Sequence, residues 1–183
     1  MAMHVALLRG VNVGKANRVP MADWRALLER IGCRNVVTLL NSGNAVFVAN
    51  RQAPAKLAAR ISERLAQEMG VDVPVIVKTA AQFAVIVADN PFAKSVADPS
   101  RLLVAFAQET AALRALAPIA ALATPPDHFH LGAAAAYLHC PDGIFTSKAA
   151  AGLLGKAGRG ATSRNWSTTL KLQALLSSGA QGS

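Results

Sequence analysis

The sequence predicts an α+β protein in two halves: an N-terminal ferredoxin-like half with the order βαββαβ, followed by a second, smaller α+β half. Two observations support this fold class. Stretches with apolar residues at helical spacing alternate with short apolar runs that are typical of strands. A polar turn containing glycine separates two of those runs, as in a β-hairpin. We place the two halves at residues 1–78 and 79–183.

The first half has the clearer pattern. A nearly continuous apolar run opens it, which indicates a strand in the middle of a sheet. Its first helix starts at a proline, and its second repeats apolar residues every four positions. The expected elements are a strand at 4–9, a helix at 20–31, strands at 36–40 and 45–49, a helix at 54–69 and a strand at 73–77.

This order of elements has a consequence for two polar segments. In a ferredoxin-like sheet, the first strand lies beside the third. The loop that leaves the first strand, Arg9–Lys15, and the turn that enters the third, Asn41–Asn44, then fall at the same end of the sheet. We therefore expect these two segments to be neighbours in space.

The second half is less regular, and the chain shows no internal sequence repeat. Pro125 and Pro126 predict a rigid bend, and Gly132 lies at the centre of an expected hairpin. The expected elements are a helix at 79–89, a strand at 102–107, a helix at 109–116, strands at 129–131 and 136–140, and helices at 147–154 and 166–176.

Composition and charge limit the function classes. The hydrophobic content of 52% excludes a disordered chain, and no apolar run is long enough to span a membrane. Cys33 and Cys140 have no metal or redox spacing, so we expect reduced thiols in a cytoplasmic protein. The net charge is +9, and no acidic residue follows Asp142. Either this basic end is a solvated surface, or the partner is a phosphate-bearing small molecule or a nucleic acid, bound in a salt-dependent way.

Three polar segments predict an anion-binding site: the loop Arg9–Lys15, the turn Asn41–Asn44, and Ser163–Trp166 before the last helix. In each segment, amide or cationic side chains lie beside backbone amides that a glycine or a helix start leaves accessible. We expect them to converge on one cleft between the halves. The predicted ligand-binding residues are Arg9, Asn12, Lys15, Asn17, Arg18, Asn41, Ser42, Asn44, Lys148, Arg164 and Asn165.

The glycine loop is not a P-loop. Its spacing is one residue short of G-x-x-x-x-G-K-[ST], and Ala16 replaces the hydroxyl that would hold magnesium. The chain also lacks the other familiar catalytic motifs, so catalytic residues stay unassigned. An enzyme acting on a phosphorylated ligand would have to use Lys15, Lys148 or Asp142 as its proton carrier.

Three histidines in the second half bear on metal binding. If the hairpin pairs His128 with His139, these two and His130 share one face, as in a three-histidine zinc site. A shift of one residue in the register removes that arrangement. We predict no metal and no cofactor, because histidines on strands are commonly just the polar side of an amphipathic pattern.

The polar segments have a second interpretation, in which they serve the fold. Asparagines in a strand-to-helix crossing often bond to their own backbone, and Asn-Ser-Gly-Asn is a good hairpin turn in itself. Ser163 or Asn165 is a natural N-cap, and Trp166 is expected to pack in the core. Three function classes therefore stay open: a ligand-binding module, an enzyme, and a structural or self-associating protein. The sequence leaves the oligomeric state open.

Several strings spread over nearly the whole chain form a specific combination. They are Ala6–Gly14 with Met21, Asn41–Phe47, Tyr137–Ile144, and Ser147-Lys148 with Arg164–Trp166 and Lys171-Leu172. In these residues the chain resembles domain-of-unknown-function family 1697, a bacterial family of uncharacterised proteins. The resemblance implies a two-part α/β fold and a cytoplasmic location, and it brings no established reaction. Two positions depart from the pattern: Cys140 stands where an aromatic residue is expected, and Leu40 replaces a polar residue.

Overall fold

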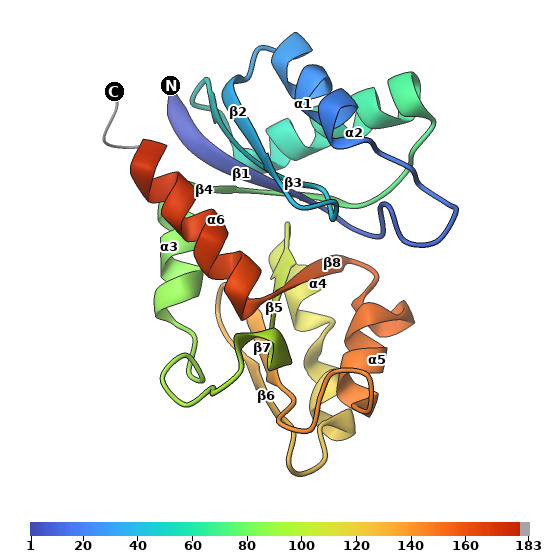
Figure 1. Cartoon of the computed structure of the whole chain (residues 1–183), viewed down its shortest axis with the longest axis vertical. Helices are drawn as coiled ribbons and strands as arrows, with labels where there is room; N and C mark the ends of the chain where they lie inside the picture. Colours follow the sequence, from blue (N-terminus) through green and yellow to red (C-terminus); the bar gives the residue numbers. More distant parts are fainter. Residues whose placement is uncertain (180–183) are drawn as a thin grey trace. The chain divides into compact units, whose positions relative to one another are not determined.

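The first unit is built on a four-stranded antiparallel sheet with two helices on one face (Figure 1). The computed structural model describes residues 1–179. The elements of this unit are β1 (Ala2–Leu8), α1 (Met21–Arg30), β2 (Arg34–Leu39), β3 (Asn44–Ala49), α2 (Pro54–Met69) and β4 (Val75–Thr79). The strand order is β2-β3-β1-β4. β1 and β2 are both antiparallel to β3, which lies between them, so the predicted βαββαβ order is confirmed.

Apolar side chains from α1 and α2 form the core over this sheet. The buried residues recur at helical spacing; the largest are Trp24, Leu27, Leu28, Leu57, Ile61 and Leu65. Ala6 and Leu8 of β1 belong to the same cluster. Burying one large apolar side chain contributes about 1.5–3 kcal/mol, so this cluster fixes both helices on the sheet and with them the ends of the loop that joins β1 to α1.

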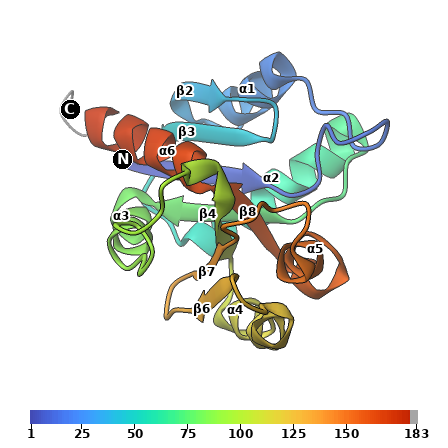
Figure 2. The same ribbon diagram turned by 60° about the horizontal axis from the view of Figure 1, so that its bottom comes forward.

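The second unit repeats the order of elements and the strand order, although the sequence shows no repeat. Its elements are β5 (Leu102–Ala107), α4 (Thr110–Arg114), β6 (His128–Leu131), β7 (Ala136–His139), α5 (Lys148–Leu154) and β8 (Ala161–Asn165). The order β6-β7-β5-β8 corresponds strand for strand to that of the first unit, and all pairings are antiparallel. Apolar side chains of α4 and α5 share one core cluster with those of β5 and β7. Figure 2 shows both helices together with β6, β7 and β8. The protein is therefore α+β, as predicted.

Two parts of the second unit differ from the sequence-based expectation. Residues 161–165 read Ala-Thr-Ser-Arg-Asn and lack apolar alternation, yet they form β8 because they pair with β5 along its length. The helix expected at 109–116 ends at Arg114, and a 3-10 segment at Ala117–Leu122 follows. Pro118 explains the break, since proline lacks the amide that an α-helix requires.

A helix directly follows the last strand of each unit: α3 (Ala80–Ala88) after β4, and α6 (Trp166–Gly179) after β8. Contacts group residues 1–83 and 172–179 into the first unit, and residues 84–171 into the second. Both helices therefore carry the chain from one unit to the other. The expected division at residue 78 stays a prediction. Among the described residues, we find no helix with the length and apolar character needed to cross a membrane.

Candidate functional site

The loop after β1 and the turn before β3 lie side by side in the first unit. Because the two strands are antiparallel, the end of β1 meets the start of β3. The amide of Leu8 donates a hydrogen bond to the carbonyl oxygen of Gly43 at 3.0 Å. A Cβ atom on Gly43 would lie 2.6 Å from Cβ of Leu8, so this approach requires glycine. The predicted proximity of Arg9–Lys15 and Asn41–Asn44 is confirmed.

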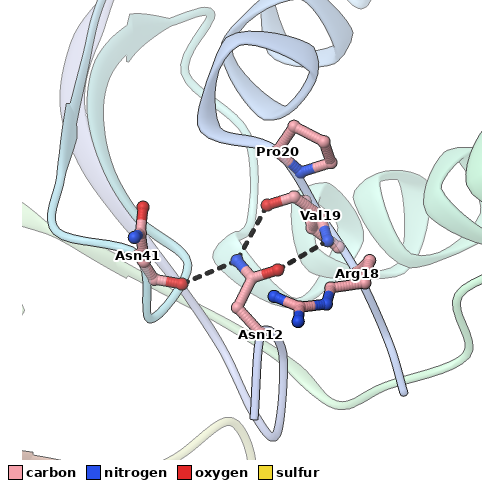
Figure 3. A pocket seen from close by; sticks show the side chains of 5 residues that line it. All are labelled: Asn12, Arg18, Val19, Pro20 and Asn41. Carbon is pink, nitrogen blue, oxygen red and sulfur yellow. Dashed lines mark hydrogen bonds between the residues drawn. The ribbon is translucent and has the colours of Figure 1, made fainter. Parts of the chain in front are cut away.

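Asn12 ties the loop to the turn. Its Nδ2 donates to the carbonyl oxygens of Asn41 at 2.7 Å and Val19 at 2.8 Å, and its Oδ1 accepts from the amide of Val19 at 2.9 Å (Figure 3). Both hydrogens of the carboxamide are thus engaged. The φ of 57° at Asn12 is a left-handed conformation that asparagine tolerates better than most residues. The side chain of Asn12 therefore serves the fold.

The other amides of these two segments also bond to the protein. Nδ2 of Asn17 donates to the carbonyl oxygen of Gly10 at 3.3 Å. Asn44 is fully buried, and its Nδ2 donates to the carbonyl oxygen of Leu39 at 2.8 Å and to Oγ of Ser42 at 2.9 Å. These bonds close the loop and the turn, so the two segments form a braced surface at one end of the sheet.

A pocket of about 240 Å³ opens where the loop meets the start of α1. It is lined by Asn12, Arg18, Val19, Pro20 and Asn41 (Figure 3). Pro20 occupies the N-cap position of α1 and has no side-chain acceptor, so it cannot cap the first amides of the helix. The guanidinium of Arg18 lies beside the amide of Asn12, and the side-chain amide of Asn41 extends away from it (Figure 3). A helix start, a guanidinium and a carboxamide are groups that bind oxyanions.

The loop carries two cations on its exposed surface. Lys15 and Arg18 are exposed, and within residues 1–179 neither takes part in an ion pair. Arg9 is half-buried, and burial lowers the pKa of its guanidinium. Asp23 is the acidic residue in the first turn of α1. An anion at the pocket would therefore be attracted by Arg18 and Lys15 and repelled by Asp23.

The third polar segment belongs to the second unit. Arg164 lies in β8 and is only 7% exposed; its Nη1 donates to Oγ1 of Thr162 at 2.7 Å and to the carbonyl oxygen of Ser163 at 2.8 Å. Burial lowers the pKa of Arg164 to about 10. Asn165 is the expected N-cap of α6, since its Oδ1 accepts from the amide of Thr168 at 2.9 Å. Convergence of this segment with the other two stays a prediction.

Lys148 lines another pocket of about 240 Å³, in the second unit. Asp127 and Asp142 line it too, together with Ser147. The hydroxyl of Ser147 donates to Oδ2 of Asp127 at 2.6 Å and accepts from the amide of Ala150, which caps α5. Because two carboxylates face one lysine, the local charge here favours a cation over an anion.

The hairpin of β6 and β7 has the register under which the histidines share a face. His128 lies opposite His139, and His130 lies opposite Tyr137. Phe92 packs on both members of the first pair, with ring centroids 6.2 Å apart in each case. Burial and the proximity of His128 lower the pKa of His139. In the part of the chain that the structure describes, no group of three or more His, Cys, Asp or Glu side chains could hold a metal ion.

The fold defines a class of α+β proteins with two units, each built on a four-stranded antiparallel sheet. The chain belongs to the family described as Protein of unknown function (DUF1697), whose model matches residues 1–137. Its structure is similar to that of the conserved bacterial protein SP0830 from Streptococcus pneumoniae, with a TM-score of 0.80 and 23% identity over 96% of this chain and 98% of that one. That likeness concerns the fold alone. No curated protein matches the chain.

Sequence reasoning identifies Arg18 and the two segments but misses two residues that line the pocket. Val19 contributes its backbone amide and carbonyl to Asn12, and Pro20 forms the edge beside α1. Pro20 could have been identified from the sequence, because a proline at a helix start has no side-chain acceptor that could cap the helix. Val19 could not have been identified from the sequence, since it contributes only backbone groups, which every residue has.

Proposed function

We propose that the chain binds a phosphate-bearing ligand, a nucleotide or a nucleic acid, at the loop pocket of the first unit. Arg18 and the first amides of α1 make the contacts, and Lys15 attracts the ligand from a longer range. One observation carries the proposal: Arg18 is exposed, has no carboxylate partner in the described residues, and lies beside a helix start that Pro20 cannot cap. Phosphate oxygens accept hydrogen bonds from both kinds of donor.

The length of the loop supports a role beyond connecting two elements. Residues 9–20 join β1 to α1, whereas residues 108–109 alone join β5 to α4 in the second unit. The two units that contain these connections have the same strand order. Because this topology can be closed by so short a connection, the longer loop is not needed for the fold. The extra residues include Lys15 and Arg18.

Bracing of the loop also supports ligand binding. A mobile loop loses conformational entropy when a ligand fixes it, and that loss weakens binding. Here the three hydrogen bonds of Asn12 hold the loop against the turn and against the residue before Pro20. The loop segment that carries Arg18 is therefore held in place before a ligand arrives.

Two other functions account for fewer of the observations. A structural or self-associating protein would explain Asn12, Asn17 and Asn44, whose amides bond to the protein itself, but it gives the loop cations no role. An enzyme acting on a phosphorylated ligand would need a proton carrier at the pocket, and on this loop Lys15 is the candidate.

The test is a titration of the purified protein with inorganic phosphate and pyrophosphate by isothermal calorimetry, at an ionic strength held constant with chloride. We expect Arg18→Ala to weaken pyrophosphate binding about 5–10-fold, because an exposed charge-assisted hydrogen bond is lost. Arg51→Ala is the matched control: it removes the same charge from an exposed residue beyond the far end of β3. Asp23→Asn should tighten binding about 2-fold by removing the repulsion at the helix start.

The comparison of the two arginine variants decides the outcome. Equal losses in Arg18→Ala and Arg51→Ala would mean that binding follows the overall charge of the protein and not the pocket. The absence of any saturable binding by the wild-type protein would contradict the proposal outright.

A further inference from the structure

We propose that β2 of the first unit pairs edge to edge with β2 of a second copy of this chain; the proposal makes no use of the loop pocket. β2 is an outer strand of its sheet and pairs with β3 (Figure 2). Beyond that pairing, the backbone of Arg34–Leu40 forms no hydrogen bond to other main-chain groups within residues 1–179. The outer row of amides and carbonyls of β2 is therefore open to another strand.

The side chains of β2 suit contact with another strand. Val36 belongs to the core under α1 and α2, so Val37 lies on the opposite face of the sheet, where it is 45% exposed. Leu39 shares that face with Val37 and is half-buried. Leu40, which directly follows β2, is 54% exposed. Exposed apolar side chains beside unpaired backbone groups favour the addition of a strand.

The corresponding edge of the second unit has features that discourage such pairing. β6 has four residues, whereas β2 has six. The two exposed side chains of β6 are the imidazoles of His128 and His130, and Asp127 directly precedes the strand. Short edge strands and polar or charged side chains protect proteins against edge-to-edge contact. In β2 this protection is confined to Arg34 and the bulge that follows it, and the last three residues pair regularly with β3.

Charge indicates a second copy of the chain as the partner. Residues 35–50 contain no Asp, Glu, Lys or Arg. Two copies that each carry a net charge of +9 repel one another, and the repulsion is weakest where the contact surface itself is uncharged. An acidic or basic partner would find no complementary charge on this edge, whereas an identical uncharged strand matches it.

The faces of β2 define how two copies pair. Residues opposite each other in an antiparallel pair lie on the same face of the sheet. A two-fold axis at Thr38, the middle of the regular segment, places Val37 of one copy opposite Leu39 of the other and Thr38 opposite itself. Pairs of both kinds stabilise antiparallel strands. The two Arg34 residues then lie about 25 Å apart along the strands, beyond the screening length of about 8 Å.

The first experiment is sedimentation equilibrium of the purified protein at several protein and salt concentrations, for the wild type, Val37→Lys and Val85→Lys. We expect a reversible wild-type dimer that tightens as salt screens the repulsion between the copies. Val37→Lys should weaken the dimer about 10-fold or more, because two apolar contacts are lost and two charges enter the contact. Val85→Lys is the matched control: it adds the same charge at a 50% exposed residue of α3 and should weaken the dimer less than about 2-fold.

A cysteine substitution tests the register directly. The thiols of Cys33 and Cys140 are buried, so they do not compete for oxidation. Residues opposite each other in an antiparallel pair have Cα atoms about 4.5–5.5 Å apart, a distance that suits a disulfide. Thr38→Cys should therefore form a disulfide between two copies under mild oxidation, and Val85→Cys should form one much more slowly.

Three results would overturn the inference. A wild type that stays monomeric at every concentration would do so, and it would leave a different chain as the occupant of this edge. Equal weakening of the dimer in the two lysine variants would show that association follows net charge and not the edge of β2. Equal rates of cross-linking in Thr38→Cys and Val85→Cys would show that the copies meet elsewhere.

Discussion

The two units of the chain share one topology but differ in the length and bracing of one connection. Both have the order βαββαβ and the same antiparallel strand order, but they differ where the first strand passes to the first helix. In the second unit, residues 108–109 make this crossing. In the first unit, residues 9–20 make it, and the side chain of Asn12 pins them to the turn before β3.

The turns between the second and third strands show a similar contrast. Residues 40–43 and residues 132–135 form turns of equal length. The first turn is held by the buried side chain of Asn44, whose place in the second unit is taken by Ala136, while the backbone amide of Gly132 bonds to the carbonyl oxygen of Ala135 in the second turn. The first unit therefore uses polar side chains to organise a sheet end that the second unit closes more simply, and this is the reason to look for function there.

The largest expected effect is on the free energy of unfolding, and it distinguishes the two connections between the first strand and the first helix. Asn12→Ala removes three hydrogen bonds and places alanine at a left-handed φ, so we expect a loss of about 3 kcal/mol in the free energy of unfolding. Glu109→Ala, at the exposed N-cap position of α4 where the glutamate side chain makes no capping bond, should change it by less than about 0.5 kcal/mol. Urea denaturation measures both. Similar losses of stability in the two variants would show that the hydrogen bonds of Asn12 do not set the first connection apart from the second.

A smaller effect is expected at the turns. Asn44→Ala gives the first turn the residue that the second unit has at the corresponding position. It leaves the carbonyl oxygen of Leu39 without its side-chain donor, and we expect a loss of about 2 kcal/mol. The same denaturation experiment checks this value. A neutral substitution would show that the turn is stabilised by its backbone alone.

Acid should act on both units, and more strongly on the first. Burial lowers the pKa of His4 and of His139 below the ordinary value of 6.5. The neutral form is then favoured in the folded state, so the stability that it contributes is present above pH 6.5 and is lost as the pH falls below it. His4 is 1% exposed and His139 is half-buried, so the loss should be reduced more by His4→Gln than by His139→Gln. Urea unfolding curves recorded between pH 7 and pH 5 measure this loss of stability. If the free energy of unfolding falls equally with pH in both variants, the ranking is contradicted.

The sequence predicts elements well where local pattern decides them. α2 was predicted at Pro54–Met69, where it lies, because its apolar residues repeat every four positions between a proline and a glycine. The proximity of loop and turn also followed, since strand order alone implies it. β8 did not follow, because Ala161–Asn165 become a strand only through pairing with β5.

The candidate site was predicted less completely, for a physical reason. Residue type identifies a carboxamide or a guanidinium but not the partner that it meets in the fold. Asn12 and Asn44 were expected to face a ligand, and their amides bond to the protein instead. Arg164 precedes a helix as expected, but it is buried in the strand that pairs with β5. Arg18 keeps the exposure that binding needs.

The most direct test of the account is a titration of the ¹⁵N-labelled protein with inorganic phosphate at constant ionic strength, followed by NMR. The account predicts saturable shifts of the amides of Arg18, Met21 and Ala22 in the first unit, and no matching shifts at Glu109 and Thr110 at the corresponding crossing of the second. Shifts that spread over exposed lysines and arginines of both units without saturating would contradict it, because they would show that the protein attracts phosphate by its net charge alone.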